Sequence, residues 1–171
     1  VGLGARHMTV STSGLVPQIR KLAAQPLQVR LAISFHGATD EVRSTIMPVN
    51  KKYPVEDLVA ACEDYVRIKK QRITFEYILI RDVNDSMEQA RLLAKQARRV
   101  GAKVNLIPYN VVDGLPWIRP EEDSQDAFLA VLRQAGAEAT LRREKGHDIA
   151  AACGQLRLQV EKSVAEKPIL N

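Results

Sequence analysis

The chain has 171 residues, of which 25 are Lys or Arg and 20 are Asp or Glu, and its formal net charge is +5. Hydrophobic residues make up 46% and charged residues 26%, which excludes a disordered or collagen-like chain and suits one domain of ordinary size. The chain contains no apolar run near the roughly 18 residues of a membrane span, and two cysteines cannot build a disulfide scaffold. We therefore expect a single domain over residues 1–171, in a reducing cytoplasmic compartment and without a membrane partner.

Segments typical of strands and helices alternate along the chain. Apolar, β-branched runs predict strands at residues 8–10, 27–33, 73–80, 103–107 and 138–141. Amphipathic patterns predict helices at residues 16–24, 40–46, 55–68, 87–100, 121–135 and 155–164. This order predicts an α/β fold in which parallel strands are joined by helical crossovers.

Helix ends account for part of the polar and charged residues. Three residues before or at the start of predicted helices are interpreted mainly as N-caps: Ser13, Asp40 and Asp85. The pair Asp85-Ser86 can cap the helix at 87–100. Arg98 and Arg99 fall in a last helical turn, where cations complement the helix dipole. Arg142 and Lys145 lie outside helix ends and are better candidates for phosphate contacts.

Hydrogen-bonding residues follow every predicted strand. These segments read STSG at 11–14, SFHG at 34–37, RDVND at 81–85, PYN at 108–110 and RREKG at 142–146. Ligands bind at the carboxyl ends of the strands in parallel β/α folds, so one rim should suit a polar ligand with hydroxyls, a carboxylate and an amine. We expect Ser11, Ser34 and Asn110 to face one shared hollow at that rim. A structural role and a ligand contact both stay open for His36.

The two cysteines have different settings. Cys62 lies on the apolar stripe of a predicted helix and is interpreted as a buried hydrophobe. Cys153 lies between a run of alanines and Gly154, at the start of the predicted last helix. A helix N-terminus lowers the pKa of a thiol, so Cys153 is either a nucleophile or a packed side chain. No metal site is predicted, because CxxC and HExxH spacings are absent.

Four runs resemble the radical SAM adenine C2-methyltransferases: STSG at 11–14, LAISFHG at 31–37, VNLIPYN at 104–110 and DIAAACGQL at 148–156. The resemblance covers nearly the whole chain, in order and with similar spacing. It implies part of an incomplete TIM-like barrel. It also implies methylation of C2 of an adenosine in 23S ribosomal RNA and in transfer RNA. A sister group of enzymes methylates C8 of the same ribosomal adenosine.

The resemblance further implies roles for individual residues. The positions that contact S-adenosylmethionine (SAM) in the family correspond to Ser11, Ser34, Phe35, His36 and Asn110. Cys153 matches the cysteine that one SAM molecule methylates and that carries the methyl group to the adenine. A second SAM is cleaved at a [4Fe–4S] cluster, which in the intact enzyme would receive its electron from a reductant such as flavodoxin.

Several parts of the family pattern lie N-terminal to the STSG segment and have no match here. They are the CxxxCxxC cluster loop, a Gly-Glu SAM motif, a second catalytic cysteine and a general base. Two distant cysteines cannot supply the three thiolates of such a cluster. The resemblance therefore implies the C-terminal half of an enzyme, inactive by itself. A barrel cut at this point exposes a strand edge at residues 8–10, through which we expect self-association.

Two other functions stay open on the sequence. The first is a non-enzymatic RNA-binding domain with a basic rim, whose salt-dependent binding would survive the substitution Cys153→Ala. The second is a sugar-phosphate-binding enzyme unrelated to SAM, with an anion held by backbone N–H groups near Gly14 or Gly146. For the methyltransferase, Arg142 and Lys145 are the expected phosphate contacts to RNA, because they flank the Cys153 segment.

Overall fold

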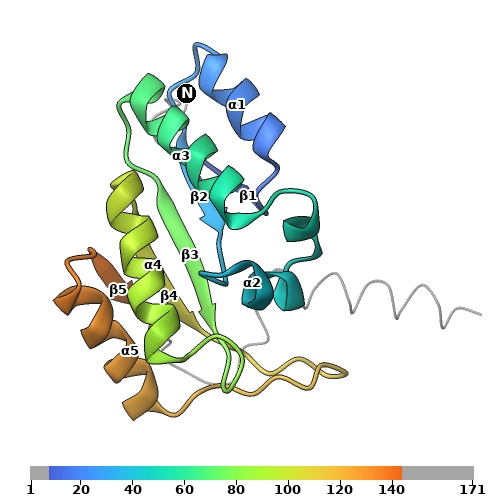
Figure 1. Ribbon diagram of the computed structural model, residues 1–171, viewed down its shortest axis with the longest axis vertical. Helices are drawn as coiled ribbons and strands as arrows, with labels where there is room; N and C mark the ends of the chain where they lie inside the picture. The colour runs from blue at the N-terminus through green and yellow to red at the C-terminus, as the bar shows by residue number, and fades with distance from the viewer. Residues whose placement is uncertain (1–7, 144–171) are drawn as a thin grey trace, which may run out of the picture.

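Five parallel strands form one sheet in the computed structural model, which describes residues 8–143 (Figure 1). The strands are β1 (Thr9–Thr12), β2 (Arg30–Ser34), β3 (Thr74–Leu79), β4 (Lys103–Pro108) and β5 (Ala139–Leu141). The helices are α1 (Val16–Ala24), α2 (Asp40–Ile46), the short 3₁₀ helix η2 (Pro48–Lys51), α3 (Val55–Lys69), α4 (Met87–Val100) and α5 (Glu122–Gln134). The spatial order of the strands, β1-β2-β3-β4-β5, equals their order in the sequence.

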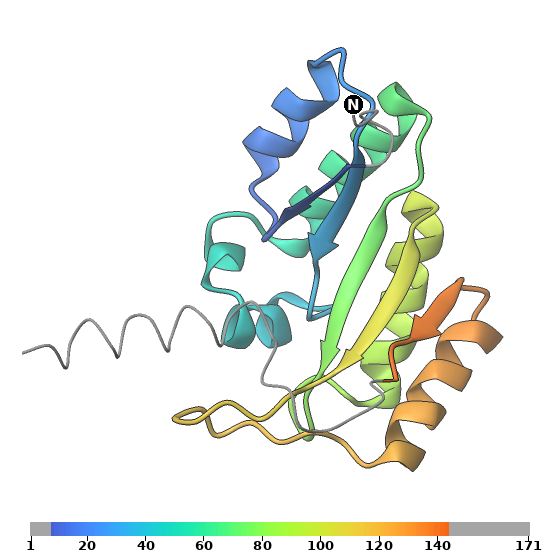
Figure 2. The ribbon, with the colours of Figure 1, turned by 180° about the vertical axis from the view of Figure 1, so that it is seen from behind.

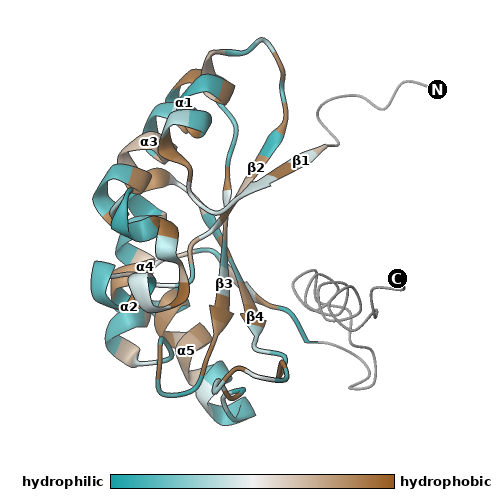
Figure 3. Ribbon diagram, turned by 90° about the vertical axis from the view of Figure 1, so that its right-hand side faces the viewer, coloured by the Kyte–Doolittle hydropathy of each residue, from teal (hydrophilic) through white to brown (hydrophobic). Residues whose placement is uncertain are grey.

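The helices cover one face of the sheet (Figure 3). The opposite face, which we call the inner face, is turned toward the viewer in Figure 2. A sequential parallel order with helices on one face is the winding of a (β/α) barrel, whereas a doubly wound sheet reverses its order and places helices on both faces. The predicted α/β fold, with the parallel repeats of a partial barrel, is confirmed.

Alternation along β3 shows how the two faces differ. Phe75, Tyr77 and Leu79 are fully buried against the helices, whereas Glu76 and Ile78 are half-buried on the inner face. Aromatic pairs fill the core between the sheet and the helices; for example, the rings of Phe75 and Phe35 stack with centroids 4.5 Å apart. The core therefore supports the sheet from one side and leaves the inner face for other contacts.

The predicted element boundaries agree closely for the helices and less well for the first two strands. β1 reaches Thr12 and so includes Ser11, which was predicted to follow the strand. β2 begins at Arg30 rather than at residue 27, because its ladder with β1 starts at the Thr9–Arg30 pair. The 3₁₀ helix η2 was not predicted. The helix predicted at residues 155–164 lies outside the described residues.

The N-cap predictions for Ser13, Asp40 and Asp85 are wrong. A cap residue needs an extended backbone, and Thr39 and Ser86 have that conformation and cap α2 and α4. Of the predicted pair Asp85-Ser86, Ser86 is thus confirmed as the cap. Asp40 is already helical, and its Oδ1 instead accepts the N–H of Val55 (2.8 Å), the first residue of α3. The acid therefore links two helices rather than ending one.

β1 is an edge strand among the described residues, and its Thr9, Val10 and Ser11 are exposed. An exposed strand edge presents unpaired backbone groups that another chain can pair with. Self-association through this edge stays a prediction.

Candidate functional site

The inner face carries two of the predicted site residues. Ser11 pairs in register with Ala32, and Ala32 lies two residues before Ser34 on the same strand. Side chains alternate along a strand, so Ser11 and Ser34 share one face. Asn110 lies just beyond β4, at the same carboxyl edge, where its Oδ1 accepts a hydrogen bond from Arg119 (3.3 Å). The structure thus brings these residues to one edge of the sheet.

A buried arginine joins the ends of the first two strands. The guanidinium of Arg43 donates to the carbonyl oxygens of Ser13 (2.7 Å), Ser34 (3.3 Å) and Phe35 (2.9 Å) and to Oδ1 of Asn50 (3.1 Å). Its side chain is 0% exposed, and burial lowers its pKa to about 10, so the group stays charged at neutral pH. A buried charge is tolerated only when its donors are satisfied, so these partners are held in one arrangement.

Two glycines allow the chain to approach this arginine closely. A Cβ atom at Gly37 would lie 2.6 Å from the backbone nitrogen of Arg43. A Cβ atom at Gly14, where φ is +105°, would lie 2.8 Å from Nη2 of the same arginine. The segments that follow β1 and β2 are therefore packed as one unit around Arg43.

His36 lies inside this unit, between Phe35 and Gly37, in a strained conformation. Its φ is 56°, a left-handed value that is uncommon for a residue with a side chain. Nδ1 accepts the N–H of Ile78 (3.2 Å), so the ring proton of the neutral form lies on Nε2. Burial, aided by the charge of Arg43, lowers the pKa of His36 to about 4. Asn84, which is fully buried, donates to the carbonyl oxygen of His36 (2.8 Å) and fixes the segment further.

Phe35 points away from the inner face. Its side chain is buried in the core against Phe75. Side chains alternate along β2, so Phe35 and Ser34 face opposite sides of the sheet. Any contact from Phe35 to a ligand on the inner face is therefore restricted to its backbone.

The structure describes one of the two cysteines and one of the two basic residues that were predicted to contact phosphate. Cys62 is fully buried, as predicted, and burial raises the pKa of its thiol to about 12. Arg142 is exposed, and its N–H continues the ladder by donating to the carbonyl oxygen of Leu106 (2.9 Å). Cys153 and Lys145 lie outside the described residues.

Residues 8–143 contain neither a cluster of metal ligands nor a membrane-spanning helix. Within that range no group of three or more His, Cys, Asp or Glu side chains could hold a metal ion. None of the helices in the same range is long and apolar enough to cross a bilayer.

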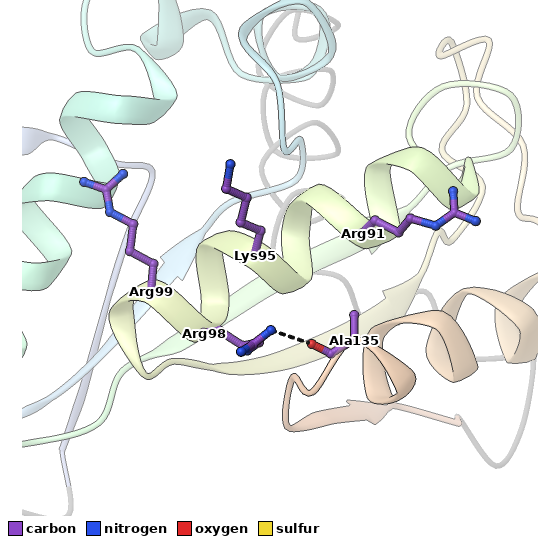
Figure 4. A pocket seen from close by; sticks show the side chains of 5 residues that line it. All are labelled: Arg91, Lys95, Arg98, Arg99 and Ala135. Carbon is purple, nitrogen blue, oxygen red and sulfur yellow. Dashed lines mark hydrogen bonds between the residues drawn. The ribbon is translucent and has the colours of Figure 1, made fainter.

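A cationic hollow of about 430 Å³ lies on the helical face, between α4 and α5 (Figure 4). Its lining consists of Arg91, Lys95, Arg98, Arg99 and Ala135. Arg98 donates to the carbonyl oxygen of Ala135 (3.3 Å), and Arg99 pairs with Glu56 and Glu63. Arg98 and Arg99 occupy the last turn of α4, as predicted, so much of this charge complements the helix dipole.

Sequence reasoning missed Arg43 and Glu76. Arg43 lies in a short helix made mostly of polar residues, where an exposed side chain is the ordinary expectation, so no sequence signal identifies it. Glu76 did leave a signal, since it alternates with apolar residues in a strand that is otherwise rich in hydrophobic side chains.

Comparisons with known proteins connect this geometry to a group of enzymes. No family model matches the chain. It is 57% identical over 165 residues to the "probable dual-specificity RNA methyltransferase RlmN" of Akkermansia muciniphila, covering 96% of this chain and 46% of that protein. It is 43% identical over 164 residues to the dual-specificity RNA methyltransferase RlmN of Jannaschia sp., with 95% and 42% covered. The chain therefore spans somewhat less than half the length of these curated relatives.

Two solved structures share the fold. A radical SAM methyltransferase from Sphaerobacter thermophilus has a TM-score of 0.85 and 48% sequence identity, covering 90% of this chain and 45% of that chain. A domain of the pyruvate-formate lyase-activating enzyme from Bacteroides vulgatus has a TM-score of 0.63 at 20% identity, which supports the fold alone.

Proposed function

We propose that this chain, which belongs to the radical SAM RNA methyltransferase family, is the C-terminal half of an enzyme that methylates C2 of adenosine in 23S ribosomal RNA and transfer RNA. The observation that carries the proposal is the 57% identity over 96% of the chain to a dual-specificity RNA methyltransferase. The alternative within the same chemistry is a C8-methylating sister enzyme. Identification of the methylated nucleoside that the intact enzyme produces would distinguish methylation at C2 from methylation at C8.

The carboxyl edge of the sheet fits SAM as a ligand. Ser11 and Ser34 place hydroxyl groups on the inner face, and His36 is a neutral imidazole with its proton on Nε2. Asn110 adds an amide at the same edge. We assign these residues to binding and orienting SAM, which supplies the methyl group when bound. The rigid unit around Arg43 would preorganise them for the ligand.

The residues of this chain do not fit a [4Fe–4S] cluster. A cluster that binds SAM at its fourth iron needs three cysteine thiolates, and the chain has two cysteines. Cys62 is buried in the core, and the burial keeps its thiol protonated. The cluster ligands of the intact enzyme would therefore come from residues outside this chain.

We assign the methyl-carrying role to Cys153 and the phosphate contacts to Arg142 and Lys145. A target adenine has to leave its stack to reach a thiol, so RNA should be held mainly by shape and by its phosphates. Arg142 follows β5 at the edge that carries Ser34 and Asn110, which suits a contact to RNA beside the methyl donor.

The isolated chain should neither hold a cluster nor methylate RNA. We expect anaerobic iron–sulfur reconstitution of the chain to give no stable 4Fe–4S absorbance after desalting, because its two cysteines cannot complete the ligand set. Iron content and methyl transfer from labelled SAM to RNA measure both properties. A stable cluster together with RNA methylation would contradict the assignment.

A second prediction concerns His36 and pH. Its pKa in the folded chain is about 4, against about 6.5 in the unfolded chain. As pH falls below 6.5 the unfolded state gains a proton that the folded state does not, so stability declines toward pH 4. The total loss is about 3 kcal/mol.

The variant His36→Asn should lack this decline. Asparagine tolerates the left-handed backbone, and its Oδ1 can accept the N–H of Ile78 in place of Nδ1. Urea unfolding at pH 7 and pH 4.5 measures the difference between the variant and the parent chain. Equal pH dependence of the two chains would show that His36 is not the group that titrates.

A protein that contains the missing part is needed to test the complete function. A hybrid would keep the part of the Akkermansia muciniphila relative that this chain does not match and carry this chain in place of the matching part. The 57% identity between the two favours correct packing of the joined halves. The hybrid should bind SAM and methylate RNA.

A further inference from the structure

A row of four polar residues crosses the inner face from one strand to the next. Ser34 pairs in register with Glu76, Glu76 with Asn105, and Asn105 with Thr140. Register partners in a parallel sheet point to the same side, and neighbouring strands lie about 4.8 Å apart. The four side chains therefore form a continuous polar row, which includes one residue of the proposed SAM site.

The hydrogen bonds in this row have a defined direction. Oγ1 of Thr140 donates to Oδ1 of Asn105 (3.4 Å), and Nδ2 of Asn105 donates to Oε2 of Glu76 (2.9 Å). Both ends of the Asn105 amide are thus engaged, which fixes the amide and with it the carboxylate. The chain of hydrogen bonds therefore ends at the Glu76 carboxylate, which is held as an acceptor next to Ser34.

The Glu76 carboxylate makes no ion pair with any residue between 8 and 143. Other carboxylates in that range do so; for example, Glu63 pairs with Arg99 and Glu138 pairs with Lys103. Glu76 is half-buried, and within residues 8–143 its carboxylate accepts a hydrogen bond from the neutral amide of Asn105. A carboxylate has about four acceptor positions, so most of this capacity is left for donors that approach from the inner face.

We propose that Glu76 accepts hydrogen bonds from the ribose hydroxyls of SAM, beside Ser34; this inference rests on the proposed function. Carboxylates also accept hydrogen bonds from the ribose hydroxyls of dinucleotides in other α/β folds. The two neighbouring hydroxyl groups of a ribose can donate together to one carboxylate, here a carboxylate that Asn105 already orients beside the Ser34 hydroxyl. The ribose is therefore the better match among the donors that SAM carries.

Binding measurements on the reconstituted hybrid test this assignment. The probes are SAM and 5′-methylthioadenosine, which keeps the ribose but lacks the amino-acid part. The substitution Glu76→Gln keeps the shape of the side chain and removes its charge, so we expect about a tenfold rise in Kd for both probes. Asn105→Ala frees the carboxylate and should raise Kd by a smaller factor. Glu88→Gln, on the exposed side of α4, is the matched control and should leave both Kd values unchanged.

The outcomes separate the inference from the function on which it rests. Equal Kd values for the parent hybrid and its Glu76→Gln variant would overturn the role of Glu76. Weaker binding of SAM with unchanged binding of 5′-methylthioadenosine would assign Glu76 to the amino-acid part and overturn the ribose contact. A folded, cluster-containing parent hybrid that does not bind SAM would overturn the proposed function itself. Thermal melting of each variant confirms that a weaker Kd does not reflect unfolding.

Discussion

Replacing Gly37 with alanine should destabilise the chain by about 3 kcal/mol or more, a large part of the stability of an ordinary domain. The added Cβ would lie 2.6 Å from the backbone nitrogen of Arg43 and 2.7 Å from its Cα. Backbone atoms inside a helix cannot move aside as a flexible side chain can. Relief of the contact would therefore shift α2 away from the end of β2.

The control for this substitution is Gly101→Ala. Gly101 has φ +74°, and a Cβ atom there would have no atom within 4 Å. Alanine at this position carries only the cost of a left-handed backbone, about 1 kcal/mol. Urea unfolding followed by circular dichroism measures both variants. If Gly37→Ala lowered the free energy of unfolding no more than Gly101→Ala does, the packing of Gly37 against Arg43 would be contradicted.

Replacing Arg43 with methionine should cost about 4 kcal/mol. Methionine fills a similar space but leaves the carbonyl groups of Ser13, Ser34 and Phe35 without the donors that Arg43 supplies. Arg43→Lys should recover only a minor part of the loss, because one ammonium group cannot reproduce the planar fork of a guanidinium. Chemical unfolding of both variants measures their free energies of unfolding, and we expect Arg43→Lys to be only slightly more stable than Arg43→Met.

Arg98→Met is the matched control for this pair. Arg98 is exposed, and its hydrogen bond to the carbonyl oxygen of Ala135 lies on the surface. Its loss should change stability by no more than about 0.5 kcal/mol. A similar small change at Arg43 would show that the carbonyl groups find water or other partners, and that the arginine does not hold the two strand ends together.

The fold could be predicted from the sequence because strand and helix patterns alternate clearly. The helix at Met87–Val100 was predicted with its observed bounds, since Ser86 precedes it and Gly101 ends it. β1 was less predictable, because Ser11 and Thr12 look like loop residues until the pairing of Thr12 with Ile33 is known. The boundary depends on the neighbouring strand, which local sequence does not describe.

The candidate site could be predicted only in part. The position of Ser11, Ser34 and Asn110 near one edge could be predicted, because a parallel sheet brings its strand ends together. Their contacts to a ligand stay a prediction. Arg43 could not be found, since its partners are mainly backbone carbonyls and any residue type supplies a carbonyl. The contact between Glu76 and Asn105 could not be predicted either, because it depends on the register between β3 and β4.

The most direct test of the account is the methyl group that the hybrid transfers to RNA. The reconstituted hybrid should produce 2-methyladenosine in 23S ribosomal RNA and in transfer RNA, detected by mass spectrometry of the digested nucleosides. The same hybrid with Cys153→Ala should produce none while it still binds SAM. A folded, SAM-binding hybrid that leaves adenosine unmodified, or one whose Cys153→Ala variant still methylates RNA, would contradict the account.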